Sequence, residues 1–334
     1  MRILTLLLLA SLSCPAVAQV LMPLEELEAL PPVLSLQKAL ANPNKVVKLD
    51  LTNQELDYVP EQLAKLKNLQ YLSLHYNNLQ ALSPVLFELK NLQVLHLGKN
   101  KLAKLPDRMH ELEHLKVLGL RNNLLTELPE HFFELGRLQR LDLGMNPIES
   151  FPANPAVPDM LRELKLDKCT KLDLEPMIDA MAQRSGLRSL SLRKCHLRTF
   201  PGNFEELNTI TYLNLSGNTA LHWDDVLDGL QGCDSLSTLI IRKSNMELLP
   251  AEIGELSSLR KLDLSNNGLI IVSDQISNLG GLTHLNLSNN RLEIVPEDVF
   301  DFEQLRYLNM ESNPLPESEL RLLKKHFARI DLKI

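Results

Sequence analysis

The sequence predicts an α/β solenoid, one elongated domain in which short repeats, each with a strand and a helical turn, stack on one another. Two observations support this fold class. Apolar residues recur in the pattern L-x-x-L-x-L-x-x-N-x-L along most of the chain, and self-similarity at a fixed period of about 20 to 50 residues is typical of solenoids. The composition, with 44% apolar and 23% charged residues in a chain of 334, also supplies enough apolar side chains for a large core.

The N-terminal segment, MRILTLLLLASLSCPAVAQ, is typical of a secretory signal peptide. A basic residue precedes the apolar run Ile3–Leu12, and Ala16 and Ala18 are small residues at the two positions that a signal peptidase inspects. We therefore expect residues 1–18 to be removed and the chain to be exported to the periplasm or the extracellular space, while Cys14 leaves a lipid-anchored form open. No segment approaches the roughly 18 consecutive apolar residues of a transmembrane helix.

Twelve repeats follow at nearly constant spacing. Nine of the eleven intervals between them are 23 residues long and two are 26. The clearest copies read LQYLSLHYNNL, LQVLHLGKNKL, LRKLDLSNNGL and LTHLNLSNNRL, and a second phrase such as LPDRMHELEH or VPEQLAKLKN separates one copy from the next. The repeats begin at Val46, Leu69, Leu92, Leu115, Leu138, Leu161, Leu187, Ile210, Leu236, Leu259, Leu282 and Leu305.

These copies resemble a leucine-rich repeat protein of the short-repeat subclass, with LPxx between strands, that is common in bacteria. The resemblance covers about residues 46–315. It implies a horseshoe-shaped solenoid in which each repeat contributes one short parallel strand to a concave face. It also implies recognition of another macromolecule rather than catalysis.

The residues within each repeat agree with this arrangement. The L-x-L core alternates with period two, as a strand with one buried face requires. A polar side chain that recurs at one inward position must be hydrogen-bonded, because an unpaired buried amide costs several kcal/mol. We therefore expect a ladder of asparagines that bind the backbone turns of neighbouring repeats. The ninth position is asparagine in eight repeats: Asn77, Asn100, Asn123, Asn146, Asn218, Asn267, Asn290 and Asn313.

Proline recurs fourteen residues after the start of seven repeats. It cannot continue the hydrogen-bonded ladder of a strand, so we expect it to fix the bend toward the convex side and assign it no chemistry. The prolines are Pro60, Pro106, Pro129, Pro152, Pro201, Pro250 and Pro296.

The ends of a solenoid need covers, since a terminal repeat would otherwise expose its apolar face. We expect residues 19–45 to form an N-terminal cap with a short helix, in which Ser35 is the N-cap and Leu36 and Leu40 share one side. Residues 316–334 are expected to form a C-terminal cap, a helix followed by ARIDLKI as a final strand. The apolar stripe of that helix comprises Leu320, Leu323 and Phe327.

The segment HELEH, residues 110–114, spells the H-E-x-x-H signature of zinc hydrolases, with two histidine ligands and a glutamate base. A zinc hydrolase that uses His110, Glu111 and His114 is thus an alternative function. The repeat register argues against it, because His110 takes a position that is phenylalanine in other repeats and His114 immediately precedes the next strand. The two histidines should therefore not share one helix, and we expect no enzyme activity, no metal and no cofactor.

Three cysteines remain after the signal peptide. Cys169 and Cys195 hold the ladder position in consecutive repeats, so their Cα atoms should lie about one strand spacing, roughly 5 Å, apart. That distance permits a disulfide, but side chains on adjacent parallel strands point the same way and make its torsion awkward. We expect buried free thiols, with the bridge left open, and a core position for Cys233.

Function should reside in the outward strand positions, the second, third, fifth, seventh and eighth of each repeat. In the second and third repeats these include aromatic and imidazole groups in a chain with only 4% aromatic residues. Exposed aromatic groups are the usual anchors of an interface. This group comprises Tyr71, His75, Tyr76, Val94, His96 and Lys99.

The outward positions of repeats four to nine are strongly basic, with eleven Lys or Arg against Asp142, Glu163 and Asp167, although the whole chain has a net charge of −7. A basic concavity concentrates its field and steers an acidic partner. We expect the partner to be a protein with an acidic surface. An anionic cell-surface glycan or peptidoglycan-associated ligand is the alternative. Nucleic acid is not expected, because the basic residues lack interleaved stacking aromatics. The basic candidates are Arg121, Lys165, Lys168, Arg193, Lys194, Arg242 and Lys243, beside Lys116, Arg140, Arg162 and Arg188.

Overall fold

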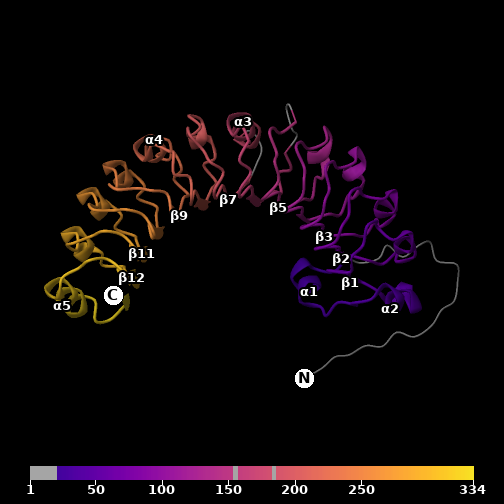
Figure 1. Cartoon of the computed structure of the whole chain (residues 1–334), viewed down its shortest axis with the longest axis horizontal. Coiled ribbons are helices and arrows are strands. Elements are labelled where there is room, and N and C mark those ends of the chain that lie inside the picture. The colour runs from indigo at the N-terminus through magenta and orange to yellow at the C-terminus, as the bar shows by residue number, and fades with distance from the viewer. Residues whose placement is uncertain (1–20, 153–156, 183–185) are drawn as a thin grey trace, which may run out of the picture.

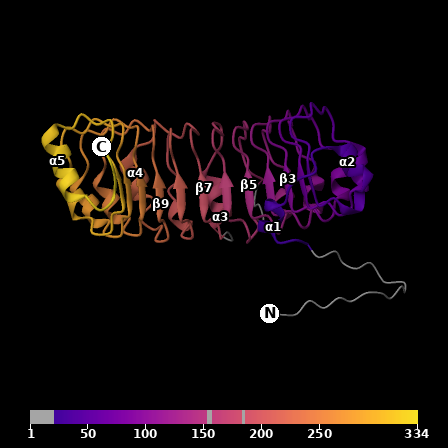
Figure 2. The same ribbon diagram turned by 90° about the horizontal axis from the view of Figure 1, so that it is seen from below.

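In a computed structural model, which describes residues 21–152, 157–182 and 186–334, the chain forms one curved arc (Figure 1). The expected signal peptide, residues 1–18, lies outside the described residues. One parallel sheet lines the inner face of the arc, with 13 strands in sequence order and without crossovers, and helical turns form the outer face (Figure 2). The predicted α/β solenoid with a concave parallel sheet is therefore confirmed.

Each strand is three residues long, and β1 to β12 cover the third to fifth positions of the repeats, so that each is centred on the first leucine of an L-x-L core. Paired leucines such as Leu49 and Leu72 lie directly opposite each other in the register, and both are fully buried. The strands are β1 (Lys48–Asp50), β2 (Tyr71–Ser73), β3 (Val94–His96), β4 (Val117–Gly119), β5 (Arg140–Asp142), β6 (Glu163–Lys165), β7 (Ser189–Ser191), β8 (Tyr212–Asn214), β9 (Thr238–Ile240), β10 (Lys261–Asp263), β11 (His284–Asn286), β12 (Tyr307–Asn309) and β13 (Asp331–Lys333).

The outer face consists mainly of 3₁₀ turns, four of which begin directly after one of the recurring prolines. Two α-helices, α3 (Glu175–Ala182) and α4 (Trp223–Asp228), replace the 3₁₀ turn where the interval is 26 residues. The three extra residues thus lengthen the outer segment and leave the strand register intact. The 3₁₀ turns are η1 (Pro43–Lys45), η2 (Glu61–Lys65), η3 (Pro84–Glu88), η4 (Asp107–Glu111), η5 (Phe132–Glu134), η6 (Phe204–Glu206), η7 (Ala251–Glu255), η8 (Asp274–Asn278) and η9 (Glu297–Asp301).

The predicted asparagine ladder is confirmed, and Asn123 illustrates its geometry. Its amide group donates to the carbonyl oxygens of Leu97 and Leu120 at 3.0 and 2.8 Å, and its oxygen accepts from the backbone N–H of Leu102 at 3.0 Å. One side chain therefore joins two repeats through three hydrogen bonds in the buried interior.

Thiols take over the ladder in two repeats. The Sγ of Cys169 donates to the carbonyl of Leu143 at 3.5 Å, and that of Cys195 donates to Leu166 at 3.1 Å. Both thiols and that of Cys233 are free and buried, as expected. Burial raises the pKa of Cys169 to about 11 and those of the other two to about 12, so these thiols stay protonated at neutral pH.

The two ends of the sheet are covered differently. At the N-terminal edge, Val33 pairs with Leu49 of β1 as an isolated bridge, and α2 (Leu36–Ala41) follows with Ser35 as its N-cap. At the other end, α5 (Glu317–His326) buries Leu323 against the core, and β13 pairs with β12. None of the helices in the described ranges has both the length and the apolar character needed to cross a membrane.

Helix α1 (Leu24–Ala29) is an element that was not expected from the sequence. Residues 19–45 were expected to form a cap with one short helix, which begins after Ser35, whereas α1 lies on the inner face of the arc, in front of the first strands (Figures 1 and 2). Its position brings the N-terminal segment onto the surface that the sequence assigns to partner binding.

Candidate functional site on the concave face

Apolar contacts seat α1 on the sheet. Leu27 is fully buried, and it forms a separate apolar cluster with Val94 of β3 and Val117 of β4. Met22 and Tyr71 pack against the same cluster. Val94 was expected to be an exposed outward residue; it does stand outside the main core, but α1 covers it completely, so that expectation of exposure is wrong.

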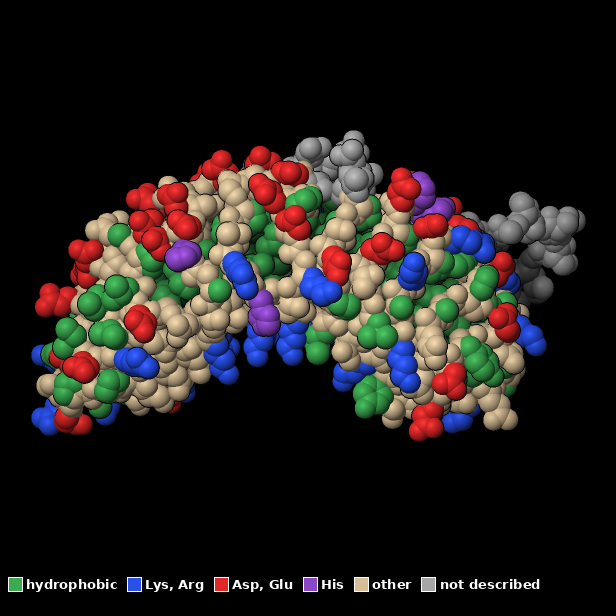
Figure 3. Space-filling view, turned by 45° about the horizontal axis from the view of Figure 1, so that its top comes forward, with side chains coloured by type: hydrophobic (Ala, Val, Ile, Leu, Met, Phe, Trp, Pro, Cys, Tyr) green, Lys and Arg blue, Asp and Glu red, His purple; other side chains and the backbone are tan. Residues whose placement is uncertain are grey.

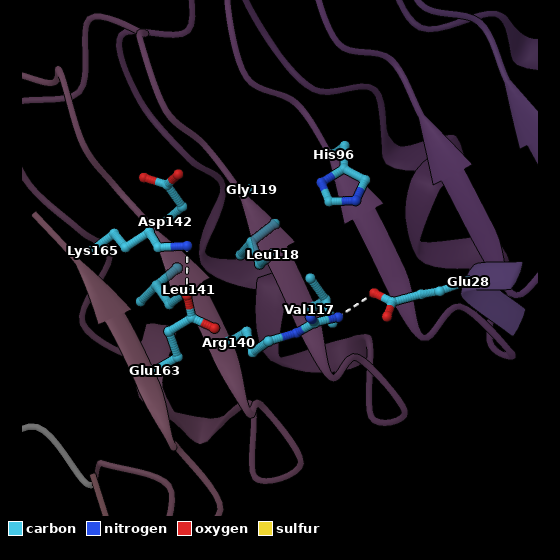
Figure 4. A pocket seen from close by; sticks show the side chains of 10 residues that line it. All are labelled: Glu28, His96, Val117, Leu118, Gly119, Arg140, Leu141, Asp142, Glu163 and Lys165. Carbon is cyan, nitrogen blue, oxygen red and sulfur yellow. Dashed lines mark hydrogen bonds and ion pairs between the residues drawn. The ribbon is translucent and has the colours of Figure 1, made fainter. Parts of the chain in front are cut away.

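Polar contacts hold the two ends of the same segment. The ammonium group of Lys48 donates to the carbonyl oxygens of Leu27 and Glu28, at 3.3 and 2.7 Å. The carboxylate of Glu28 forms an ion pair with Arg140 of β5 (Figure 4). At the start of the segment, the backbone N–H of Met22 donates to Gln70 at 2.9 Å. The N-terminal segment is therefore bound by residues of several repeats.

The predicted aromatic and imidazole residues do come together beside α1. The rings of Tyr71 and His96 meet edge to face at 5.5 Å between centroids, and those of His75 and Tyr76 lie 6.5 Å apart. The ammonium group of Lys99 lies 5.0 Å from the centre of the Tyr76 ring. Burial lowers the pKa values of His75 and His96, so both imidazoles are neutral at physiological pH.

A cavity of about 200 Å³ opens between α1 and the strands β3 to β6 (Figure 4). Glu28 closes one side of it, while Asp142 and Lys165 lie on the other. Gly119 also lines the cavity, and a larger residue here would crowd the imidazole ring of His96, because a Cβ atom would lie 2.8 Å from its Nδ1. Burial raises the pKa of Asp142. The cavity is thus charged on its walls and bounded by the N-terminal segment itself.

Besides Arg140, which pairs with Glu28, four of the predicted basic residues form ion pairs. Asp167 lies 3.5 Å from Arg121 and 3.9 Å from Arg193. Further along the sheet, Lys165 pairs with Glu163 at 2.5 Å and Arg242 with Asp263 at 3.6 Å. These four basic side chains are therefore less available to a partner than their sequence positions indicate.

The predicted lysines at the eighth position differ from these four. Lys168, Lys194 and Lys243 are exposed, and within the part of the chain that the structure describes no carboxylate lies within ion-pair distance of them. All three have a left-handed backbone, with φ between 53° and 61°, as has Lys99. In Figure 3, Lys and Arg side chains gather along the inner rim of the arc, whereas acidic side chains cover the outer face. We call Lys168, Lys194 and Lys243 the lysine row.

The HELEH segment does not adopt the single helix that the zinc-hydrolase signature requires. The 3₁₀ turn η4 ends at Glu111, so His110 and His114 do not share one helix, as expected. Glu111 is paired with Arg108 at 2.6 Å and Lys90 at 3.3 Å, and its hydrogen bond to Arg108 lowers its pKa to about 2. A carboxyl group with so low a pKa is a poor general base. Across residues 21–152, 157–182 and 186–334, no three His, Cys, Asp or Glu side chains are grouped as metal ligands would be.

The sequence interpretation missed a second concave cavity, of about 250 Å³, over β9 to β12. The rings of His284 and Tyr307 stack at 5.9 Å beside it, and Lys261 and Asp263 line it. The signal was present, because both aromatic groups occupy the third position of consecutive repeats. The cavity was missed because the sequence analysis followed the excess of basic residues, which is confined to repeats four to nine.

Comparisons with known proteins bear on the family and the fold. A family model described as "Leucine rich repeat" matches residues 44–102, 90–148 and 271–315, and a second with the same description matches residues 258–279. No curated protein sequence matches the chain significantly.

Three solved structures show similar folds. A TDR receptor is 23% identical with a TM-score of 0.62, over 85% of this chain and 51% of that one. An internalin of Listeria monocytogenes is 18% identical with a TM-score of 0.59, over 86% of both chains. A chain of the Drosophila Toll–Spätzle complex is 19% identical with a TM-score of 0.58, over 81% of this chain and 41% of that one. The chain thus spans about half or less of the receptor and Toll-complex chains, and at these identities the likeness concerns the fold alone.

Proposed function

Because the chain is a leucine-rich repeat protein, we propose that it is an exported, non-enzymatic recognition scaffold that binds a protein partner with an acidic surface through its concave face. The observation that carries this proposal is the lysine row, a set of exposed positive charges without carboxylate partners in the described part of the chain, on a protein whose net charge is −7. Charges of one sign in a concavity attract a partner of the opposite sign and speed its encounter.

Other features support a scaffold rather than an enzyme. The HELEH glutamate is engaged in two ion pairs, and the exposed ring of Tyr76 offers an aromatic anchor beside the lysine of the third repeat. The Toll–Spätzle structure, a fold relative of this chain, is that of a complex. Export rests on the signal-like residues 1–18.

The decisive experiment is capture of binding partners from envelope and culture-medium fractions by the immobilised full chain. The test variant carries Lys168→Glu, Lys194→Glu and Lys243→Glu. A control variant carries Lys38→Glu, Lys324→Glu and Lys325→Glu, three exposed lysines on α2 and α5, and so has the same net charge. We expect the native and control chains to retain a protein that the test variant loses, with added salt weakening the contact.

Equal capture by all three chains would refute the role of the lysine row. The alternative ligand, an anionic cell-surface or peptidoglycan-associated glycan, shares the requirement for positive charge. Protease treatment of the fractions before capture distinguishes the two ligands, since it destroys a protein ligand and leaves a glycan intact.

A further inference from the structure

Helix α1 packs on a small apolar patch, formed by Val94 and Val117, within an otherwise polar face. We call the two valines the bed, and the bed together with the polar residues that bind the segment the seat. Val94 and Val117 occupy the third position of their repeats, where the flanking strands carry Tyr71 and Arg140. Leu27 fills the space above both valines and leaves them 0% and 7% exposed. Two adjacent valines at outward strand positions need such a cover, because water would otherwise contact them. The sheet is thus shaped to receive a leucine side chain at this point.

Two basic residues beside the bed bind the C-terminal half of α1, one through its backbone and the other through its Glu28 side chain. Lys48 donates to two carbonyl oxygens at the C-terminal end of α1, where the helix dipole concentrates negative charge. Arg140 pairs with the carboxylate of the residue directly after the buried leucine. The bound segment itself, MPLEELEAL, contains three glutamates and no basic residue. The seat therefore accepts an acidic helix that presents a leucine and then a carboxylate.

The helix that occupies the seat is short and mostly exposed. Helix α1 has six residues, only one of which is buried, and its first turn has no side-chain cap. Helices this short are marginal on their own. Gln93 also belongs to the seat, since its Nε2 donates to the carbonyl oxygen of Met22 at 2.9 Å. Its Oε1 and the Nε of Arg140 are buried without a hydrogen-bond partner in the described structure. A ligand that supplied a donor and an acceptor here would fit better than α1 does.

We infer that this seat is a docking site for an acidic amphipathic helix of the partner, and that Met22–Leu30 is an exchangeable occupant of the same chemistry. This inference rests on the proposed function and specifies which element of the acidic partner is bound. Because it is tethered, this occupant competes at an effective concentration of about millimolar. The apparent affinity for a competing helix equals the affinity for an empty seat multiplied by the fraction of time that the seat is empty.

The test uses a fluorescent peptide of residues 21–32, LMPLEELEALPP, and measures its anisotropy with the full chain. In a Leu27→Glu chain the tethered segment is unseated while the bed stays intact, so we expect the peptide to bind at least tenfold more tightly than to the native chain. A Leu34→Glu chain, which carries the same change at an exposed position, should behave like the native chain. Adding Val117→Glu to the Leu27→Glu chain should abolish binding, as should Leu27→Glu in the peptide.

The inference is overturned if the Leu27→Glu chain binds the peptide no more tightly than the native chain, or if binding survives Val117→Glu. Hydrogen exchange of the native chain gives a second test that needs no variant. The amides of Leu27 and Leu30, bonded within α1, should exchange at least a hundredfold faster than those of β3, and equal protection would contradict an exchangeable occupant.

The two proposals can fail separately. If the peptide does not bind but the lysine-row variant loses its captured partner, only the docking site for an acidic helix is wrong. If the peptide binds as expected but all three chains capture the same partners, only the role assigned to the lysine row is wrong.

Discussion

The hydroxyl group of Ser191 donates a 2.5 Å hydrogen bond to the carboxylate of Asp167, and both side chains are buried on the concave face. The backbone N–H of Arg193 donates to the same carboxylate at 3.3 Å, and the guanidinium groups of Arg121 and Arg193 approach it. Asp167 therefore stabilises the sheet and at the same time reduces the positive charge of the face.

Asp167→Asn should separate these two effects. The hydrogen bonds lose their charged acceptor, so we expect the free energy of unfolding to fall by about 1 to 2 kcal/mol. The two arginines lose their counter-charge, so an acidic partner should bind more tightly at low salt. Urea denaturation followed by circular dichroism, together with partner titration, measures both. Weaker binding of the partner would contradict the assigned role of the charge.

Asn123→Ala tests the ladder. It removes three hydrogen bonds. The N–H of Leu102 is left without its partner, whereas the carbonyl groups of Leu97 and Leu120 each keep a second amide donor from the neighbouring ladder asparagine. We expect a loss of about 2 kcal/mol in the free energy of unfolding, since one buried group is left unpaired. Lys101→Ala, an exposed neighbour, should change stability by less than about 0.5 kcal/mol. A similar result for both variants would disprove the ladder's importance.

Cys169→Asn should stabilise the protein. Cysteine supplies a single weak bond to Leu143, and the backbone N–H of Ile148, which stands where Leu102 stands relative to Asn123, makes no hydrogen bond within the described part of the chain. An asparagine at position 169 would bind both groups, and we expect a gain of about 1 kcal/mol by urea denaturation. In contrast, Cys233→Asn places an amide among core side chains and should destabilise the protein.

Stability should fall in mild acid, in part because of His96. Burial lowers its pKa in the folded state below the ordinary value of 6.5. Between the two pKa values the unfolded chain binds more protons than the folded one, so the free energy of unfolding decreases as the pH falls through 6.5. Urea midpoints at pH 7.5 and 5.5 should therefore differ less in His96→Gln than in the native chain. An identical pH effect in both would rule out this contribution.

Most of the solenoid could be predicted from spacing alone. The leucine register defines the strands, and the recurring buried polar position implies a ladder, because both depend on contacts between adjacent repeats that the sequence repeats many times. The place of Cys169 and Cys195 in the ladder could also be predicted, because both occupy the ninth position of their repeats. The longer outer segments that contain α3 and α4 coincide with the two irregular intervals.

The position of α1 could not be predicted in this way. Its contacts join Leu27 to Val94 and Val117, which lie in repeats two and three places from the end, and nothing in the period specifies where a non-repeating segment will pack. The stripe of Leu24, Leu27 and Leu30 at intervals of three was a signal for an amphipathic helix. The ion pairs of the arginines could not be predicted either. The sequence shows which charged residues occupy outward positions, but not which of their side chains lie within ion-pair distance of each other.

The sheet also has a consequence for how this surface changes over evolutionary time. Every strand pairs only with the strands of the adjacent repeats, in sequence order from β1 to β13. A duplicated 23-residue unit would find the same neighbours on both sides, and a deleted one would let its flanking strands meet. Gene duplication or loss can therefore lengthen or shorten the arc by one strand spacing of about 4.8 Å at a time, which changes how long a ligand the concavity can hold while the remaining repeats keep their contacts.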